Sequence, residues 1–209
     1  MKNDITVYLF QTVSHSPKEV SQAAYCFVRQ HIAEVTGSDP ERLVFGRTGQ
    51  GKPYIEKEGI CFNLSHSGNT VAIAFSECEI GVDIEEVRPA NLRIAERYFA
   101  ESDRRYLALA ADEQDKLNRF FALWTAKEAY LKRYGAGLSG GLDFSVADEN
   151  GLLTRVASER FPPAGIFYRC LCGEDFGLHA PFHTASGSVR YILSVCADRT
   201  ENVFLNMII

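Results

Sequence analysis

The chain has 209 residues, of which 46% are hydrophobic and 23% are charged, as in a globular protein long enough to bury a sizeable core. Its net charge at pH 7 is −5, so it lacks the overall basic charge that is typical of nucleic-acid-binding proteins. No stretch is apolar for long enough to span a membrane, and the first residues lack the apolar core of a signal peptide. We therefore expect a protein that binds neither nucleic acid nor membrane.

The six cysteines are scattered through apolar surroundings and lack the paired spacing of zinc fingers. Two of them, Cys170 and Cys172, lie on one face of an expected strand, but two ligands do not make a metal site. The cysteines therefore indicate a reduced protein in the cytoplasm, without structural zinc.

The first half of the chain alternates strand and helix patterns. An apolar stripe over residues 17–35 predicts an amphipathic helix that ends at Gly37. Residues 70–76 and 79–85 look like the two strands of a hairpin around Cys78. Further strands are expected at residues 5–10, 43–45 and 61–65.

After Pro89 the pattern changes to helices. Residues 92–99 and 102–111 predict two short helices, and residues 113–134 predict a long one because they contain no glycine or proline. From residue 144 onward, short strand patterns are separated by glycine and proline turns. The chain therefore predicts an α+β fold that divides near Pro89.

The segment GVDIE at residues 81–85 carries two carboxylates within a pattern that otherwise predicts a buried strand. Side chains alternate along a strand, so Asp83 and Glu85 point to the same face, with Cα atoms roughly 6–7 Å apart. Two anions on one half-buried face repel each other, and burial makes each of them more costly. A positive partner is therefore expected next to them.

The long expected helix supplies a third carboxylate on its apolar stripe. Glu128 follows Phe121 and Trp124 at helical spacings, and Lys132 comes one turn later. A surface pair between Glu128 and Lys132 is the alternative interpretation. Together with Asp83 and Glu85, however, Glu128 completes an oxygen-ligand set suited to Mg²⁺. The absence of a histidine near Asp83 and Glu85 argues against zinc or copper.

A magnesium site of this kind often also binds a phosphate. Residues 63–68 end an expected strand in a turn with hydroxyl groups, one imidazole and backbone N–H groups, which can bind an anion. Lys52 can add a positive charge. The turn alone is weak support, because Ser65 and His66 have no Asp placed to complete a hydrolase triad.

Four motifs occur in the order and spacing of one known enzyme family: GKPY at 51–54, FNLSHSG at 62–68, GVDIE at 81–85 and WTAKEAYLK at 124–132. With these motifs the chain resembles the 4′-phosphopantetheinyl transferases, and its length is similar to that of the surfactin-synthetase type. The resemblance is strong from residue 51 to about residue 138 and thin on either side. It implies two similar α+β subdomains, residues 1–90 and 91–209, which form a pseudo-dimer in one chain with the active site between them.

The resemblance implies an activity and a set of site residues. The activity is Mg²⁺-dependent transfer of 4′-phosphopantetheine from coenzyme A to a serine of an apo acyl or peptidyl carrier protein, with release of adenosine 3′,5′-bisphosphate. The metal ligands it implies are Asp83, Glu85 and Glu128; the coenzyme contacts are Lys52, Ser65 and His66; and the contact with the transferred phosphate is Lys132. A monomer is expected.

Two positions depart from the family pattern. Asp103 stands where the family has a glutamate proposed as the base for the carrier serine, and it is one methylene shorter, so a metal-bound water is the alternative proton acceptor. The first 41 residues contain few of the cations that the family uses for the 3′-phosphate of coenzyme A. We expect Arg47 and Lys52 to replace them.

Two other functions remain open at this stage. One is a Mg²⁺-dependent phosphohydrolase, since three carboxylates and a lysine also suit attack by water. The other is a degenerate homologue that binds coenzyme A or a carrier protein without catalysis. The intact carboxylate and lysine positions favour the transferase.

Overall fold

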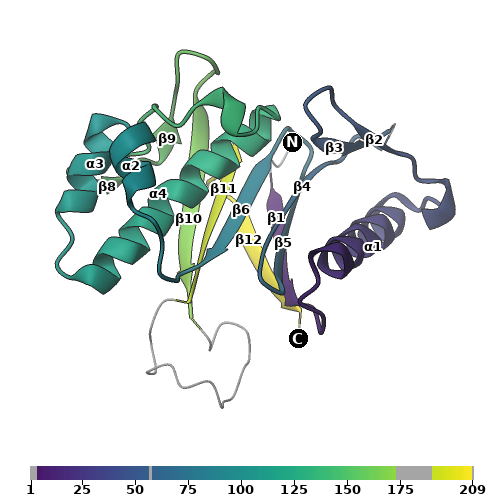
Figure 1. Ribbon diagram of the computed structural model, residues 1–209. Coiled ribbons are helices and arrows are strands. Elements are labelled where there is room, and N and C mark those ends of the chain that lie inside the picture. Colours follow the sequence, from purple (N-terminus) through teal and green to yellow (C-terminus); the bar gives the residue numbers. More distant parts are fainter. Residues whose placement is uncertain (1–3, 57, 173–189, 209) are drawn as a thin grey trace.

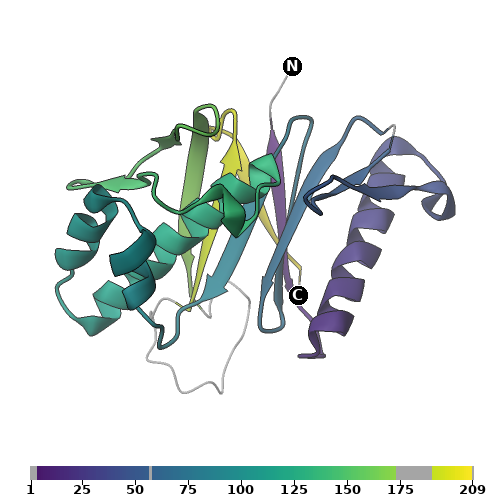
Figure 2. The same cartoon turned by 45° about the horizontal axis from the view of Figure 1, so that its top comes forward.

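The computed structural model describes residues 4–56, 58–172 and 190–208 (Figure 1). The strands fill the middle of the molecule, with the long helix α1 on one flank and helices α2, α3 and α4 on the other. Figure 2 shows the same three layers after rotation. The expected α+β fold is confirmed.

The first sheet has the strand order β12-β1-β5-β4. Its strands are β1 (Ile5–Gln11), β4 (Cys61–Ser67), β5 (Thr70–Ser76) and β12 (Val203–Ile208). Strand β12, from the far end of the chain, runs parallel to β1, whereas the other pairs are antiparallel. The first sheet therefore combines both ends of the described sequence.

Helix α1 (Pro17–Thr36) covers the outer face of the first sheet. It begins with proline in its first turn, where the missing N–H has no helical partner to lose. It ends at Gly37, whose φ of 71° lies in the left-handed region that glycine adopts without strain. Its apolar stripe is buried, as expected.

The second sheet has the strand order β6-β11-β10-β9 and is antiparallel throughout. Its strands are β6 (Gly81–Glu86), β9 (Arg155–Val156), β10 (Ala164–Leu171) and β11 (Tyr191–Ala197). The expected hairpin of residues 70–76 and 79–85 is wrong, because β5 pairs with β1 and β4 while β6 pairs with β11. The chain thus passes from one sheet to the other between Ser76 and Gly81, before the expected boundary at residue 90.

The helices of the second half follow the expected ranges closely. They are α2 (Arg93–Tyr98), α3 (Glu101–Ala108) and α4 (Glu113–Tyr134). Asp112 caps α4 by accepting a hydrogen bond from the backbone N–H of Asp115, and Gly135 ends it with a φ of 67°. The short elements are η1 (Pro40–Arg42), β2 (Phe45–Arg47), β3 (Pro53–Ile55), η2 (Leu138–Gly140), β7 (Ala147–Asp148) and β8 (Gly151–Leu152).

Three apolar clusters hold these layers together. One joins α1 to the first sheet, one lies between the two sheets, and one joins α4 to the second sheet. Within the described residues, no helix is both long and apolar enough to cross a lipid bilayer.

His31 is expected to make the stability of the cluster beneath α1 depend on pH. Its ring centroid lies 4.8 Å from that of Tyr8 and 4.4 Å from that of Phe75. Burial lowers the pKa of His31, which nearby Glu34 opposes, so the unfolded state binds the proton more tightly than the folded state does. We expect the free energy of unfolding to fall as the pH drops from about 7.5 to 5.5, through the range in which a free histidine titrates.

Urea unfolding at these two pH values measures this effect. The His31→Phe variant keeps an aromatic ring but cannot titrate, so it should show a smaller loss of stability at the lower pH than the wild type. Equal losses in the two proteins would assign the pH dependence to other groups.

Candidate active site

The two sheets meet where β4 lies against β6, and polar side chains of β4 bridge the junction. Ser65 Oγ donates a 2.7 Å hydrogen bond to Asp83 Oδ1, and Ser67 Oγ donates one of 2.7 Å to Glu85 Oε2. The backbone N–H of Val82 donates to Asn63 Oδ1 at 2.8 Å. Alternate residues of each strand share a face, so one polar face of β4 meets the two carboxylates of β6.

Helix α4 brings a lysine and a third carboxylate to the same junction. Lys132 Nζ lies 2.6 Å from Asp83 Oδ1 and donates to Ser65 Oγ at 2.9 Å. Glu128 lies one helical turn before Lys132, close enough to Asp83 and Glu85 for their charges to act on it. The structure therefore gathers five of the expected site residues from three elements.

The carboxylates carry an electrostatic cost in this arrangement. Burial raises the pKa of Glu85, which the hydrogen bond from Ser67 opposes. Burial also raises the pKa of Glu128, and the charge of Asp83 raises it further. Asp83 is 4% exposed, and its Oδ2 is buried without a hydrogen-bond partner in the described part of the chain. The site thus holds more negative charge than Lys132 balances.

Asp83 Oδ2 is a buried carboxylate oxygen without a hydrogen bond in the described residues, and two further carboxylates, Glu85 and Glu128, lie near it. Such a group fits a hard cation, which prefers oxygen ligands. Within residues 4–56, 58–172 and 190–208, however, no three acidic, histidine or cysteine side chains are arranged as a ready metal-ligand set. Lys132 Nζ contacts Oδ1, the other oxygen of Asp83. The donor chemistry fits Mg²⁺, and binding it would require side-chain rearrangement.

Comparison with known proteins identifies the family. A model described as "4′-phosphopantetheinyl transferase superfamily" matches residues 79–196, more than half of the chain. The chain belongs to this superfamily. A second model, of the N-terminal part of a 4′-phosphopantetheinyl transferase, matches residues 3–78. The two matches meet between residues 78 and 79, where the chain passes from the first sheet to the second.

Three curated relatives carry the same family name. The chain is 39% identical over 131 residues to 4′-phosphopantetheinyl transferase psf-1 of Bacillus pumilus, which covers 61% of this chain and 55% of the relative. It is 30% identical over 181 residues to gsp of Aneurinibacillus migulanus, covering 83% and 76%. It is 40% identical over 121 residues to Sfp of Bacillus subtilis strain 168, covering 57% and 54%. The chain thus matches only about half the length of two of these relatives.

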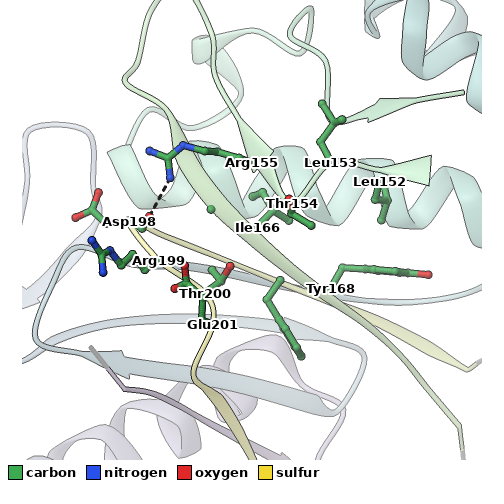
Figure 3. A pocket seen from close by; sticks show the side chains of 12 residues that line it. Leu152, Leu153, Thr154, Arg155, Ile166, Tyr168, Asp198, Arg199, Thr200 and Glu201 are labelled. Carbon is green, nitrogen blue, oxygen red and sulfur yellow. Dashed lines mark hydrogen bonds between the residues drawn. The ribbon is translucent and has the colours of Figure 1, made fainter. Parts of the chain in front are cut away.

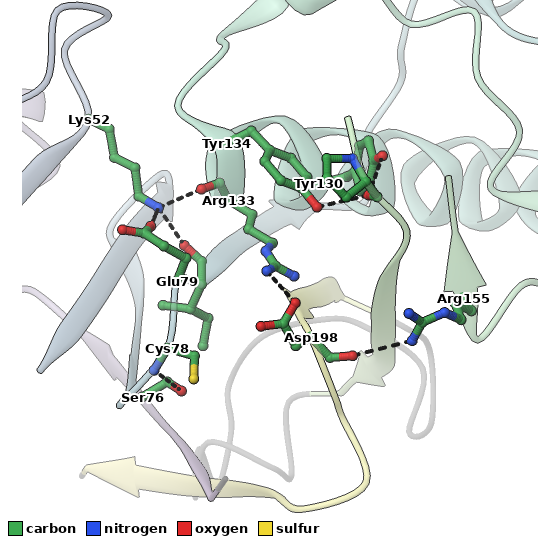
Figure 4. A network of polar contacts seen from close by, with 11 residues as sticks. Lys52, Ser76, Cys78, Glu79, Tyr130, Arg133, Tyr134, Arg155 and Asp198 are labelled. Carbon is green, nitrogen blue, oxygen red and sulfur yellow. Dashed lines mark hydrogen bonds and ion pairs between the residues drawn. The ribbon is translucent and has the colours of Figure 1, made fainter. Parts of the chain in front are cut away.

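Lys52, expected in this family to contact coenzyme A, joins the two halves of the molecule (Figure 4). Its Nζ donates to Ile80 O at 3.0 Å and to Arg133 O at 2.7 Å, and it forms an ion pair with Glu79. The Lys52 side chain is 9% exposed. Its ammonium is therefore engaged by protein groups, and a coenzyme phosphate would have to compete with them.

The other two expected coenzyme contacts, His66 and Arg47, lie on different elements. His66 lies near the end of β4, next to Ser65, and keeps part of its surface exposed. Partial burial of its ring, together with the charge of Lys132, lowers its pKa. Arg47 is exposed in β2 and donates to Gly51 O and to Tyr25 Oη. Their contacts with coenzyme A remain predictions.

Asp103 is not placed as the sequence suggested. It is fully buried in α3, where Oδ1 accepts hydrogen bonds from the N–H groups of Val146 and Ala147, both at 2.9 Å. Its Oδ2 lies 2.6 Å from Lys127 Nζ. The expectation that Asp103 acts as the base is therefore wrong for this arrangement, because a carrier serine cannot reach a carboxylate with no exposed surface.

Sequence reasoning missed the roles of Asn63 and Ser67. Both lie on the same strand face as Ser65, so the alternation of residues in FNLSHSG was the signal that could have found them. It was not used because nothing in the sequence places β4 beside β6.

A separate cavity of about 540 Å³ lies along β10, away from the carboxylates (Figure 3). Its walls include Leu152, Arg155, Tyr168 and Arg199. None of the expected site residues lines it. A second hollow, of about 250 Å³, lies beside Glu85 and is lined mainly by apolar groups, including Phe120, Phe121 and Trp124.

Proposed function

We propose that this protein transfers 4′-phosphopantetheine from coenzyme A to a serine hydroxyl of an apo carrier protein. The serine oxygen forms a bond to the β-phosphorus of the coenzyme pyrophosphate, and adenosine 3′,5′-bisphosphate leaves. The observation that carries the proposal is the cluster of Asp83, Glu85, Glu128 and Lys132, with its orphaned buried oxygen, in a member of this family.

Asp83, Glu85 and Glu128 would hold Mg²⁺ at this cluster. When bound, the ion neutralises charge on the pyrophosphate and on the leaving bisphosphate. The buried, unpartnered Oδ2 of Asp83 supports this assignment because a buried anionic oxygen without a hydrogen bond is costly unless a positive group meets it.

The chain's own residues then have distinct tasks. Lys132 can bind oxygens of the transferred phosphate, and its Nζ already contacts Ser65 Oγ. The Ser65 hydroxyl could bind the phosphate as well, once it turns away from Asp83 Oδ1. A carboxylate oxygen of Glu128 that does not hold the ion can accept the proton of the carrier serine. No covalent enzyme intermediate is needed.

Compartment and assembly form part of the proposal. Within the described residues, five cysteines are free thiols, namely Cys26, Cys61, Cys78, Cys170 and Cys196, which supports a reducing compartment such as the cytoplasm. We expect the protein to act as a monomer, because the strands and helix that build the site come from one chain. Size-exclusion chromatography with light scattering tests that expectation.

Intact-mass spectrometry of an apo carrier protein tests the activity. After incubation with this protein, coenzyme A and Mg²⁺, the carrier should gain the mass of one phosphopantetheine, and the gain should disappear when EDTA replaces Mg²⁺. Several acyl and peptidyl carriers should be assayed. Release of inorganic phosphate without carrier modification would instead indicate a phosphohydrolase, and coenzyme A binding with neither product would indicate a non-catalytic homologue.

A further inference from the structure

Helix α4 carries a second polar cluster, centred on Lys127. This side chain and that of Asp103 are both 0% exposed, and Lys127 Nζ lies 2.6 Å from Asp103 Oδ2. Lys127 Nζ also donates to Leu142 O at 2.9 Å and to Phe144 O. A buried ion pair is tolerated best when further hydrogen bonds satisfy both groups. Here Lys127 Nζ has two carbonyl acceptors and Asp103 Oδ1 has two N–H donors, whereas Asp103 Oδ2 has no hydrogen bond within the described residues and is met by the lysine charge.

The cluster ties three segments to α4. Asp103 belongs to α3, and its Oδ1 accepts two N–H groups of the segment after Phe144. The rings of Phe99 and Phe144 lie 4.8 Å and 4.6 Å from Lys127 Nζ, close enough for cation–π attraction. The start of α3, Phe99 at the end of α2 and the segment after α4 therefore converge on one lysine.

A second buried contact fixes α4 from the side of the sheet. Thr125 Oγ1 and Ser194 Oγ of β11 are hydrogen-bonded at 2.8 Å, and both side chains are 0% exposed. Successive residues of an α-helix are about 100° apart, so Thr125 and Lys127 point to nearly opposite sides of α4. The helix is thus held against rotation on two sides.

Glu128 follows Lys127 directly, and its position depends on that rotation. The side-chain surface of a helix lies about 5–6 Å from the axis, so a rotation of about 20° would move the Glu128 carboxylate by about 2 Å. A shift of about 1 Å at reacting groups can reduce a rate about 100-fold.

We propose that Asp103 and Lys127 are positioning residues: their buried ion pair sets the rotation of α4 and thereby places Glu128 and Lys132 against β6. This inference rests on the proposed function. It assigns Asp103 a role through Lys127 in place of proton abstraction.

A double-mutant cycle separates the two roles of Asp103. The proteins are the wild type, Asp103→Asn, Lys127→Gln and the double variant, in which two neutral amides can still hydrogen-bond. We expect each single change to reduce kcat and the affinity for Mn²⁺, measured by electron paramagnetic resonance with coenzyme A present, by about 10–100-fold, as for other residues that orient metal ligands. The double variant should recover most of both.

If Asp103 were the base, its change to Asn would reduce kcat equally with Lys or Gln at position 127 and would leave Mn²⁺ affinity unchanged. That result would overturn the inference. Unchanged kcat and Mn²⁺ affinity in folded single variants would overturn it as well. Glu101→Gln is the matched control, because the Glu101 side chain lies in the same helix and is 69% exposed; it should resemble the wild type.

The Thr125→Val variant keeps the test decisive if a charged-pair variant does not fold. It removes the opposite anchor while preserving side-chain shape, so the inference expects reduced kcat and Mn²⁺ affinity. Wild-type values of both would contradict it. A wild type that neither modifies a carrier nor binds Mn²⁺ would remove the proposed function, and the inference with it. An active wild type whose variants break the expected pattern would overturn the inference alone.

Discussion

Replacing Glu128 by glutamine should reduce carrier modification by about 10²–10⁴-fold, the range attributed to a positioned acid–base group. Glutamine keeps the size of the side chain but can neither accept the serine proton nor supply a charged oxygen to a cation. The measurement is the initial rate of carrier modification by intact mass, at saturating coenzyme A and Mg²⁺.

The same change should stabilise the metal-free protein. Because burial raises the pKa of Glu128, the folded state binds its proton more tightly than the unfolded state, and ionisation at neutral pH lowers the free energy of unfolding. Glutamine removes that cost. Each kcal/mol regained should raise Tm by about 2–4 °C in a chain of this size.

Glu113→Gln is the matched control for both measurements. Glu113 lies in the first turn of the same helix and is exposed, so the change should leave the transfer rate unaltered. If Glu128→Gln lowered Tm while it abolished activity, the activity loss would reflect unfolding, and Glu128 would lose its assigned role.

Local pattern was enough to predict the parts of the site that lie within one element. The range of α4 was predicted correctly because residues 113–134 contain no glycine or proline and Gly135, which adopts the left-handed conformation, follows them. The shared face of Asp83 and Glu85 follows from strand alternation alone. The position of Glu128 on the apolar stripe of α4 then indicated that it belongs with Asp83 and Glu85.

Pairing between strands could not be predicted in the same way. The segments 70–76 and 79–85 have the composition and spacing of a hairpin, but each finds a better partner elsewhere in the chain. Strand β6 pairs with β11, which follows more than 100 residues later. Such a choice depends on which apolar faces fit together, and the local sequence does not contain that information.

The environment of Asp103 was equally beyond local pattern. A carboxylate near the start of an expected helix is usually exposed, where it favours the helix dipole. Here it faces Lys127, 24 positions away, and the N–H groups of Val146 and Ala147, more than 40 positions away. Only the packing of α3 on α4 shows that Asp103 is a buried partner of Lys127 and not a base that a substrate can reach.

Gly81→Ala should damage both stability and activity, because the backbones of β6 and α4 lie in close contact at this glycine. A Cβ at position 81 would lie 2.0 Å from Ala129 O and 2.5 Å from the backbone nitrogen of Arg133. Both are backbone atoms of α4, so no side-chain movement can relieve the overlap and the helix must move away from β6. Overpacking of this kind costs about 1–3 kcal/mol of unfolding free energy.

The activity should fall further than the stability loss explains. Asp83 and Glu85 follow Gly81 on β6, while Glu128 and Lys132 lie on the helix that must move. A displacement of about 1 Å between the two elements should lower kcat about 100-fold even at temperatures where the variant is folded. Urea unfolding and the intact-mass assay measure the two effects separately.

Gly49→Ala provides the matched control, since no atom lies within 4 Å of a Cβ built at that position. It should keep wild-type stability and activity. A Gly81→Ala protein with reduced stability but wild-type kcat would mean that the site tolerates separation of β6 from α4. The metal ligands would then have to come from one element, and Glu128 could not share a cation with Asp83 and Glu85. A loss of kcat in the folded variant would instead show that catalysis depends on the close contact that this glycine permits.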